Sequence, residues 1–220
     1  VQAEWVRRGI ADGRKLVGRK IGLTSKVMQE ATGITEPDYG AIFADQIFEN
    51  GSVIDHDRFS SVRIEVELAF VLKDDLHGPS ASIFDVLRAT EYVVPALEIL
   101  DSRIEMQGRT IVDTISDNAA LGAMIYGGNP VAPDAVDLRW VSALLYRNEA
   151  IEDTGVAAAV LNHPAMGVAW LANKLHAHDE HLRAGDIILA GSFTKPMWVH
   201  PGDTVHADYG KLGTCLLYTS

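Results

Sequence analysis

The clearest hydrophobic pattern in the chain lies in residues 62–72, where apolar and polar side chains alternate before the sequence turns apolar throughout. In the β-strand that this alternation predicts, Ile64 and Val66 lie on one face, whereas Glu65 and Glu67 lie on the other. The apolar run that follows places hydrophobic side chains on both faces. We therefore expect a buried strand with two carboxylates close together on one side.

The remaining patterns predict more strands than helices. Ser25 is placed to cap a helix and Gly33 to stop it, and the pair Asn50-Gly51 predicts a β-hairpin across residues 46–54. Strands in this proportion favour an α+β fold over a regular βαβ arrangement. We expect helices over residues 2–16, 25–31, 80–90 and 164–175, and further strands over residues 19–23, 92–100, 119–126, 140–146, 149–153, 186–190 and 202–208.

Composition limits the partners of the protein. The 220 residues are 47% apolar and 22% charged, with a formal net charge of −11, which is ordinary for a soluble protein and argues against nucleic acid or an anionic membrane surface as a partner. No apolar run is long enough to span a bilayer. Cys215 is the only cysteine, which excludes an intrachain disulfide and fits a cytoplasmic location.

Glu65, Glu67 and Glu98 are candidate ligands of a divalent metal ion. Two neighbouring carboxylates in a buried strand resist ionisation, and Glu98 is a lone acidic residue in the apolar run 93–100, which is costly unless it is paired or binds a metal. A divalent cation held by three carboxylates resolves both problems. The alternative is a metal-free binding or structural domain in which these side chains lie on a solvated face.

Lys20, Asp38 and Tyr39 are further candidates for a site. Lys20 lies near glycines in an apolar segment, where it is either an exposed lysine or a buried cation that faces an anionic ligand. Asp38 and Tyr39 precede Gly40. This stretch is either an ordinary proline turn or a loop that carries chemistry on a rigid scaffold.

Three histidines near residue 180 have a spacing that looks at first like a metal site. His176, His178 and His181 do not share one face of a helix, and charged residues lie among them. We expect them to lie in a surface loop.

Several ordered motifs resemble the fumarylacetoacetate hydrolase superfamily over most of the chain, from residue 18 to about residue 213. Within the superfamily, the chain is most similar to the branch of hydratases and decarboxylases, and in particular to the bacterial 2-oxo-hept-4-ene-1,7-dioate hydratases of homoprotocatechuate degradation. The motifs that carry the resemblance are KIGLTS at residues 20–25, EPDYG at 36–40, RIEVELAF at 63–70, PALE at 95–98, DTISDN at 113–118, LNHP at 161–164 and GSFT at 191–194.

The resemblance implies a mixed β-sandwich roll with flanking helices, assembled into homo-oligomers. It implies that Glu65, Glu67 and Glu98 hold Mg²⁺, or Mn²⁺ in its place, which agrees with the preference of these cations for oxygen ligands. It also implies that Lys20 and Asp38 are the acid and base residues. The open positions of the metal would accept a small-molecule 2-oxo acid.

The reaction implied by the resemblance is the addition of water to a 2-hydroxy-2,4-dienoate or its 2-oxo tautomer. An example is the conversion of 2-oxo-hept-4-ene-1,7-dioate to 4-hydroxy-2-oxoheptanedioate in the catabolism of aromatic compounds. We expect Tyr39, Ser192 and Thr194 to contact the substrate, the last two through its carboxylate. Arg63 or Lys195 is expected to meet a distal carboxylate.

The sequence departs from the pattern of the heptenedioate hydratases at some positions, so a related hydratase or decarboxylase activity is an alternative. Residues 103–112 form a shorter segment than in the heptenedioate hydratases, more like that of 2-hydroxypenta-2,4-dienoate hydratases or 2-oxo-3-hexenedioate decarboxylases. A carbon–carbon hydrolase is disfavoured, because residues 36–39 lack the His/Glu arrangement that activates water in those enzymes. The N-terminal helical region of the family is largely absent, and the tail after residue 213 lacks a closing strand pattern. We therefore expect residues 1–220 to form a single catalytic domain with truncated ends.

Overall fold

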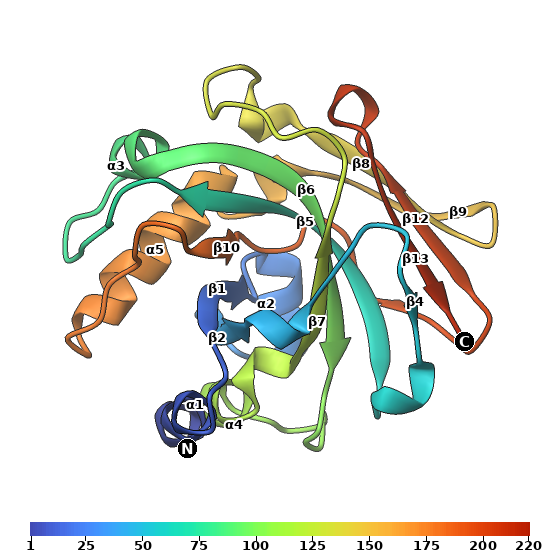
Figure 1. Cartoon of the computed structure of the whole chain (residues 1–220), viewed down its shortest axis with the longest axis horizontal. Helices are drawn as coiled ribbons and strands as arrows, with labels where there is room; N and C mark the ends of the chain where they lie inside the picture. The colour runs from blue at the N-terminus through green and yellow to red at the C-terminus, as the bar shows by residue number, and fades with distance from the viewer.

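The strand predicted from the alternating pattern forms as β5 (Val62–Leu72) and lies in the larger of two β-sheets in the computed structural model, which describes residues 1–220. The other strands of this sheet are β1 (Leu16–Gly22), β2 (Asp38–Phe43), β3 (Ile47–Phe48), β6 (Thr90–Asp101), β7 (Leu121–Tyr126), β10 (Ile187–Leu189) and β11 (Met197–Trp198). Their order is β2-β1-β10-β5-β6-β7-β3, and β11 also pairs with β5. β5 and β6 are long and curved, and the rest of the sheet bends with them (Figure 1).

The smaller sheet packs against the first and closes the roll (Figure 1). Its strands are β4 (Val53–Ile54), β8 (Ser142–Arg147), β9 (Ala150–Val156), β12 (Thr204–Asp208) and β13 (Thr214–Thr219), in the order β4-β13-β12-β8-β9. The strands predicted over residues 140–146 and 149–153 form as β8 and β9, which pair with each other in the antiparallel direction. Both sheets are mixed, because β1 runs parallel to β10 and β13 runs parallel to β4. The predicted α+β class with mixed sheets is confirmed.

Helices flank the sheets. They are α1 (Gln2–Ala11), α2 (Lys26–Thr32), α3 (Ile83–Ala89), α4 (Ile111–Ser116) and α5 (Pro164–His176). α5 is the longest, packs against α3 and β1, and buries residues that include Val168, Leu171, Ala172 and Leu175. None of the helices is both long enough and apolar enough to cross a membrane.

A continuous cluster of 41 buried hydrophobic residues joins the two sheets and α5. It includes Ile64 and Val66 from one face of β5. The opposite face of β5 carries Glu65 and Glu67 and then Ala69, which belongs to a second and smaller cluster. β5 is therefore buried on both faces, as predicted, and its two carboxylates lie inside the protein.

The capping predicted at both ends of α2 is confirmed, and two further helices begin with similar signals. At the start of α2, the Met28 N–H donates to Ser25 Oγ at 3.2 Å, and Gly33 ends the helix in the left-handed conformation with φ of 72°. Pro164 lies in the first turn of α5, and Ser82 caps α3. These local signals decide the boundaries because each satisfies backbone groups that the helix leaves free.

The predicted N-terminal helix is too long. α1 ends at Ala11, and Gly13 then adopts a φ of +89°, which turns the chain away from the helix axis. The Ala44 N–H donates to the Lys15 carbonyl at 2.9 Å, and Leu16 already belongs to β1. Pairing with β2 therefore outweighs the helical spacing of the apolar residues.

The hairpin predicted around Asn50-Gly51 is wrong. Gly51 does turn the chain, with φ of +82°, but the strands on either side enter different sheets, where β3 pairs with β7 and β4 pairs with β13. The Asn50 side chain binds β13 instead, donating to the Thr214 carbonyl at 3.3 Å and accepting from the Leu216 N–H at 2.7 Å. Asn50 and Gly51 therefore lie where the chain crosses from the larger sheet to the smaller one.

The expectation that the tail after residue 213 lacks a strand is also wrong. β13 lies between β4 and β12 in the smaller sheet, and Cys215 and Leu217 belong to the main core. Its apolar alternation is too short to stand out in the sequence. Hydrogen bonds to two neighbouring strands establish it in the fold.

We expect Gly18→Ala to destabilise the fold, because a Cβ at this position would lie 1.9 Å from the Ile187 carbonyl oxygen on β10. Forcing the two backbones apart should lower the free energy of unfolding by about 1–3 kcal/mol, measured by urea denaturation. Val27→Ala, at an exposed position of α2, is the control and should change this free energy by less than about 0.5 kcal/mol. An unchanged denaturation midpoint for Gly18→Ala would contradict the prediction.

Candidate metal centre and active site

β5 and β6 bring three carboxylates together. Glu65 and Glu67 are two residues apart on β5 and share a face, and the antiparallel register pairs Glu65 with Glu98 on β6. One oxygen from each carboxylate lies within 4.8 Å of the others. The structure thus gathers the three residues expected to bind metal into one cluster.

These carboxylates have few partners within the protein. Glu67 and Glu98 are fully buried, at 0% exposure. The Gly191 N–H donates to Glu67 Oε2 at 2.9 Å, but Glu67 Oε1 and Glu98 Oε2 accept no hydrogen bond. Buried carboxylate oxygens without partners are costly, so the cluster calls for a further positive group.

Lys20 on β1 is the cation beside this cluster. Its side chain is 2% exposed, and its Nζ lies 2.9 Å from Glu98 Oε1. The same Nζ donates a hydrogen bond to the Ala119 carbonyl at 2.8 Å. The interpretation of Lys20 as a buried cation facing anionic groups is therefore correct, and the exposed-lysine alternative is wrong.

The carbonyl that receives Lys20 lies in a strained turn. Asn118, Ala119 and Ala120, which form the 3₁₀ segment η3 (Asn118–Ala120), have φ values of +56°, +52° and +57°, a conformation that non-glycine residues rarely adopt. The Asn118 side chain holds the turn against β2, because it accepts from the Ala41 N–H at 2.7 Å and donates to the Ala41 carbonyl at 2.9 Å. Backbone strain is thus located next to Lys20.

Burial and repulsion alter the pKa values in the cluster. Burial, followed by the charge of Glu98, raises the pKa of Glu65 to about 8 and the pKa of Glu67 well above its ordinary 4.5. Burial also raises the pKa of Glu98, although Lys20 opposes this. Burial alone would lower the pKa of Lys20, but the surrounding carboxylates, with Glu98 first, outweigh it and raise this pKa. Without a bound cation, the cluster therefore retains protons on carboxylates at neutral pH.

The chemistry of these donors fits a divalent cation. Three carboxylates from two adjacent strands supply oxygen ligands, which Mg²⁺, Mn²⁺ and Ca²⁺ accept readily. The buried oxygens without hydrogen bonds on Glu67 and Glu98 belong to this cluster, and a cation bound there would satisfy them. One lysine against three carboxylates also leaves a negative charge for the cation to neutralise.

Asp38 at the start of β2 joins the same site. The register of the strands pairs Asp38 with Gly22 of β1. A Cβ at Gly22 would lie 2.3 Å from Asp38 Oδ1 and 3.1 Å from Lys20 Nζ, so the missing side chain makes room for both groups. Asp38 Oδ1 is buried and accepts no hydrogen bond. It is therefore free to exchange a proton with a bound molecule.

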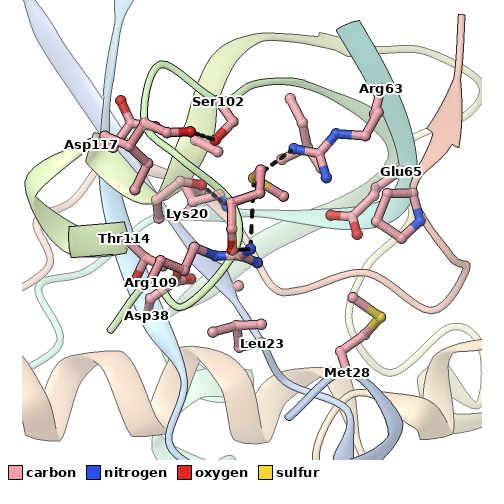
Figure 2. Close-up of a pocket in the computed structure, with 17 residues that line it drawn as sticks. Lys20, Leu23, Met28, Asp38, Arg63, Glu65, Ser102, Arg109, Thr114 and Asp117 are labelled. Atoms are coloured by element: carbon pink, nitrogen blue, oxygen red, sulfur yellow. Dashed lines mark hydrogen bonds between the residues drawn. The ribbon is translucent and has the colours of Figure 1, made fainter. Parts of the chain in front are cut away.

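A pocket lies against these groups (Figure 2). Lys20, Asp38 and Glu65 line it, together with Arg63 and Arg109. Figure 2 shows Arg63 and Glu65 reaching into the pocket from β5, while Arg109 enters from the segment between β6 and α4. The apolar residues of its lining include Leu23, Met28, Leu100, Ile104, Met106 and Pro196.

The segment between β6 and α4 forms one wall of this pocket. Arg103 fastens the segment to the turn after α4, because its Nε donates to Asp117 Oδ1 at 2.8 Å and its Nη2 donates to the Asp117 carbonyl at 2.6 Å. Residues 103–112, which we expect from the sequence to form a short segment, contribute to the pocket lining, so the length of this segment bears on which substrate fits. The residues of this wall are Ser102, Ile104, Met106 and Arg109.

Arg63 is the one residue of the predicted substrate contacts that lines the pocket. It is buried, and burial lowers the pKa of its guanidinium. Tyr39, by contrast, follows Asp38 directly on β2 and so points to the other face, where it packs on Trp170 with ring centroids 6.4 Å apart. Its placement does not support a contact with substrate in this pocket.

Ser192, Thr194 and Lys195 also lie outside the pocket lining. Ser192 Oγ donates to the Thr194 carbonyl at 2.9 Å, and Thr194 Oγ1 accepts from the Val66 N–H at 3.1 Å, so both hydroxyls hold the chain beside β5. Lys195 is exposed, and its backbone N–H donates to Asp153 Oδ2 at 2.8 Å. The structure gives these three residues structural contacts.

The three histidines near residue 180 are not gathered into a metal site. His176 and His178 are exposed at the end of α5 and in the turn that follows. His181 instead stacks on His77, with ring centroids 4.2 Å apart, and lies beside Asp75. This grouping joins two distant segments, which sequence spacing does not reveal.

Two residues of the site, Arg109 and Gln2, are not among the candidates named from the sequence. Arg109 lines the pocket, and its only signal in the sequence is its position in the segment that we expect to be shorter than in the heptenedioate hydratases. Gln2 braces the site from α1, because its Nε2 donates to the Tyr39 carbonyl at 2.8 Å and to Asn118 Oδ1 at 3.2 Å. The contact between Gln2 and Asn118 spans 116 positions in the sequence, so no local pattern signals it.

Comparison with known proteins assigns the chain to a family. The family described as Fumarylacetoacetate (FAA) hydrolase C-terminal matches residues 25–216. The chain belongs to the fumarylacetoacetate hydrolase family. The resemblance drawn from the sequence motifs is thereby confirmed.

Individual members of the fumarylacetoacetate hydrolase family match nearly the whole chain. It is 59% identical to 2-oxo-hept-4-ene-1,7-dioate hydratase from Escherichia coli, over 97% of this chain and 82% of that protein. It is 39% identical to 2-keto-4-pentenoate hydratase from Paraburkholderia xenovorans (strain LB400), over 97% of this chain and 80% of that protein. The solved structure of 4-oxalocrotonate decarboxylase from Pseudomonas putida G7, complexed with magnesium and adipate, superposes with a TM-score of 0.96 at 36% identity and covers 100% of this chain and 83% of that chain.

The raised carboxylate pKa values predict a pH-dependent stability for this member of the fumarylacetoacetate hydrolase family when divalent cations are removed. Glu65 keeps its proton up to about pH 8 in the folded protein but loses it near pH 4.5 when unfolded. The folded state therefore binds more protons between these values, and the free energy of unfolding falls as the pH rises, by more than about 1 kcal/mol. Urea denaturation in EDTA measures this fall.

Two comparisons control the pH measurement. Saturating Mg²⁺ should remove most of the fall, because the cation replaces the protons. Glu65→Gln should reduce it in EDTA, because the variant cannot titrate there. A free energy of unfolding that rises with pH over the same range in EDTA would contradict the prediction.

Proposed function

We propose that this protein is a hydratase that adds water to a 2-oxo-4-enoate or its 2-hydroxy-2,4-dienoate tautomer. The proposed substrate is 2-oxo-hept-4-ene-1,7-dioate and the product is 4-hydroxy-2-oxoheptanedioate, in the catabolism of aromatic compounds. The observation that carries the proposal is that Lys20, Asp38 and Glu65 line one pocket, and that Glu65 forms a cluster with Glu67 and Glu98. The 59% identity to the Escherichia coli hydratase supports the choice of substrate.

Glu65, Glu67 and Glu98 would hold the metal ion, which we propose to be Mg²⁺, with Mn²⁺ able to replace it. When bound, such a cation acts as a Lewis acid toward the oxygens of a 2-oxo acid. The glutamates themselves set its position through the register of β5 and β6. The magnesium in the 4-oxalocrotonate decarboxylase structure supports this assignment.

Lys20 holds a proton and a positive charge at the reacting end of the pocket. Its raised pKa keeps it an ammonium at neutral pH. The bond from Nζ to the Ala119 carbonyl fixes the direction of the side chain, so its charge can stabilise negative charge that develops on the 2-oxo end of the substrate. A fixed donor of this kind needs no reorganisation during the reaction.

Asp38 moves the proton of the added water in this proposal. Its Oδ1 accepts no hydrogen bond from the protein, so it can accept one from the water that adds at C4, after protonation of the dienoate at C5 has placed the remaining double bond in conjugation with the 2-oxo group. Met28, Ile104 and Pro196 supply apolar surface around the substrate chain, which excludes other water molecules. Hydration at one carbon is then favoured over unselective solvent attack.

Two related reactions remain specific alternatives. The 4-oxalocrotonate decarboxylase from Pseudomonas putida G7 superposes at a TM-score of 0.96, and loss of CO₂ from a 2-oxo-3-hexenedioate would use a similar enolate. Hydration of the shorter 2-hydroxypenta-2,4-dienoate is favoured by the short segment 103–112 beside the pocket and by the 39% identity to 2-keto-4-pentenoate hydratase. Analysis of the products separates all three.

We further propose that residues 1–220 act as one catalytic unit, in a homo-oligomer in the cytoplasm. The two sheets share one core, which supports a single unit. The buried free thiol of Cys215 is the state that a reducing compartment maintains. Exposed apolar side chains such as Trp140, Trp198 and Phe84 supply surface that association would cover.

The function is tested by an ultraviolet assay with products identified by mass. 2-Oxo-hept-4-ene-1,7-dioate, 2-hydroxypenta-2,4-dienoate and 2-oxo-3-hexenedioate are supplied separately, with Mg²⁺ and then with EDTA. We expect Mg²⁺-dependent gain of one water molecule on the heptenedioate. Water gain confined to the pentadienoate, or loss of CO₂ from the hexenedioate, would select the corresponding alternative, and turnover indifferent to EDTA would contradict a role for the glutamate cluster.

We expect Asp38→Asn to lower kcat by about 10²- to 10⁴-fold, because the amide cannot accept the proton that the carboxylate moves. KM should change little, since the variant keeps the shape of the side chain. Steady-state kinetics measure both values, and thermal unfolding checks that the variant folds. Asp57→Asn, at an exposed position, is the matched control, and a kcat for Asp38→Asn close to that of the control would exclude the proposed role.

A further inference from the structure

Arg63 is a buried cation without an acidic partner in the protein. It is 8% exposed, and its Nε has no hydrogen-bond partner. None of the ion pairs of the structure includes it; its guanidinium lies 4.0 Å from Met106 Sδ and 5.3 Å from the ring centroid of Trp198. Glu65 on the same face of β5 belongs to the metal cluster. An unpaired buried guanidinium is costly, and an anionic ligand would offset that cost.

Arg109 approaches the same place from the opposite wall. Its Nη1 lies 3.6 Å from Met106 Sδ and donates to the Met106 carbonyl at 2.9 Å. The two guanidinium groups therefore meet at one sulfur atom, where the dashed lines of Figure 2 converge. Arg109 also forms no ion pair with a carboxylate. Two like charges that face each other attract an anion between them.

The arginines belong to the same pocket as the reacting groups. Lys20, Asp38 and Glu65 line it together with Arg63 and Arg109, and apolar side chains lie among them. A ligand that matches this lining carries one anionic group for the metal cluster, an apolar middle and a second anionic group for the arginines. Extended dicarboxylates have this pattern, whereas monocarboxylates lack the second anionic group.

We propose that Arg63 and Arg109 together form a carboxylate-binding subsite that selects 2-oxo acids with a distal carboxylate. This inference rests on the proposed function and assigns recognition of the distal carboxylate of its substrate to these two residues. Guanidinium groups suit the role, because each can bind a carboxylate through two parallel, charge-assisted hydrogen bonds. Lys195, the other residue expected to meet a distal carboxylate, is exposed and lies outside the pocket lining.

The first test is binding without turnover. 2-Oxoheptanedioate and 2-oxoheptanoate have the same chain length and differ only in the distal carboxylate, and calorimetry with Mg²⁺-loaded protein gives the Kd of each. The unmodified protein should bind the dicarboxylate roughly 10- to 100-fold more tightly. Equal affinity for the two compounds would overturn the proposal.

Variants then assign the preference to the two arginines. Arg109→Met should remove most of the preference for the dicarboxylate while changing the Kd of 2-oxoheptanoate by less than about twofold. Arg63→Met should act in the same direction, and Arg109→Lys should retain part of the preference, because a lysine keeps the charge but loses the paired hydrogen bonds. Arg183→Met, at an exposed position, should leave the preference unchanged.

Loss of affinity for both compounds in Arg109→Met would overturn the proposal, because the residue would then support the reacting end or the fold. A preference that survives in Arg109→Met would also overturn it. Since these measurements need no turnover, they remain informative if the hydratase assay fails. Conversely, hydration of the heptenedioate by a protein without this binding preference would reject the subsite and retain the proposed function.

Discussion

The balance of charge between one buried lysine and the carboxylates around it is the interaction on which the rest of the structure depends. Glu67 and Glu98 have no access to water, and Lys20 neutralises only part of their charge. Strand register creates this arrangement, because a slip of one residue between β5 and β6 would turn the glutamates to the opposite face. The apolar core on the other face of β5 prevents such a slip. Hydrophobic packing thus holds in place charges that would otherwise destabilise the protein.

The sequence predicted the centre of the fold well and its connections poorly. The alternation in β5 and the lone Glu98 in an apolar run are local patterns, and both predict correctly that these strands are buried. Asn50 and Gly51 do form a turn, as their type predicts, but the sheet that each flanking strand joins depends on partners far along the chain. β13 was missed for the same reason, because its hydrogen bonds come from β4 and β12.

In the candidate site, too, the features that depend on distant parts of the chain are the ones that the sequence did not predict. Treating residues 36–40 as a loop placed Asp38 and Tyr39 together, whereas in β2 they lie on opposite faces and only Asp38 lines the pocket. The hydroxyls of Ser192 and Thr194 satisfy backbone groups, which a motif cannot distinguish from binding a ligand. Arg109 lies in the pocket because the connection between β6 and α4 brings it and Arg63 to the same sulfur atom of Met106, a property of the assembled molecule.

The hydrogen bonds between Arg103 and Asp117 separate the part of the pocket that can vary from the strands that cannot. The two residues close the ends of a connection that forms one wall of the pocket, while Lys20, Asp38 and the glutamates sit on strands of the sheet. Residues between the fastened ends can change in number and kind without disturbing the pairing of those strands. Such an arrangement allows the wall of the pocket to change while the strands that carry the proposed metal ligands and the proposed acid and base residues keep their pairing.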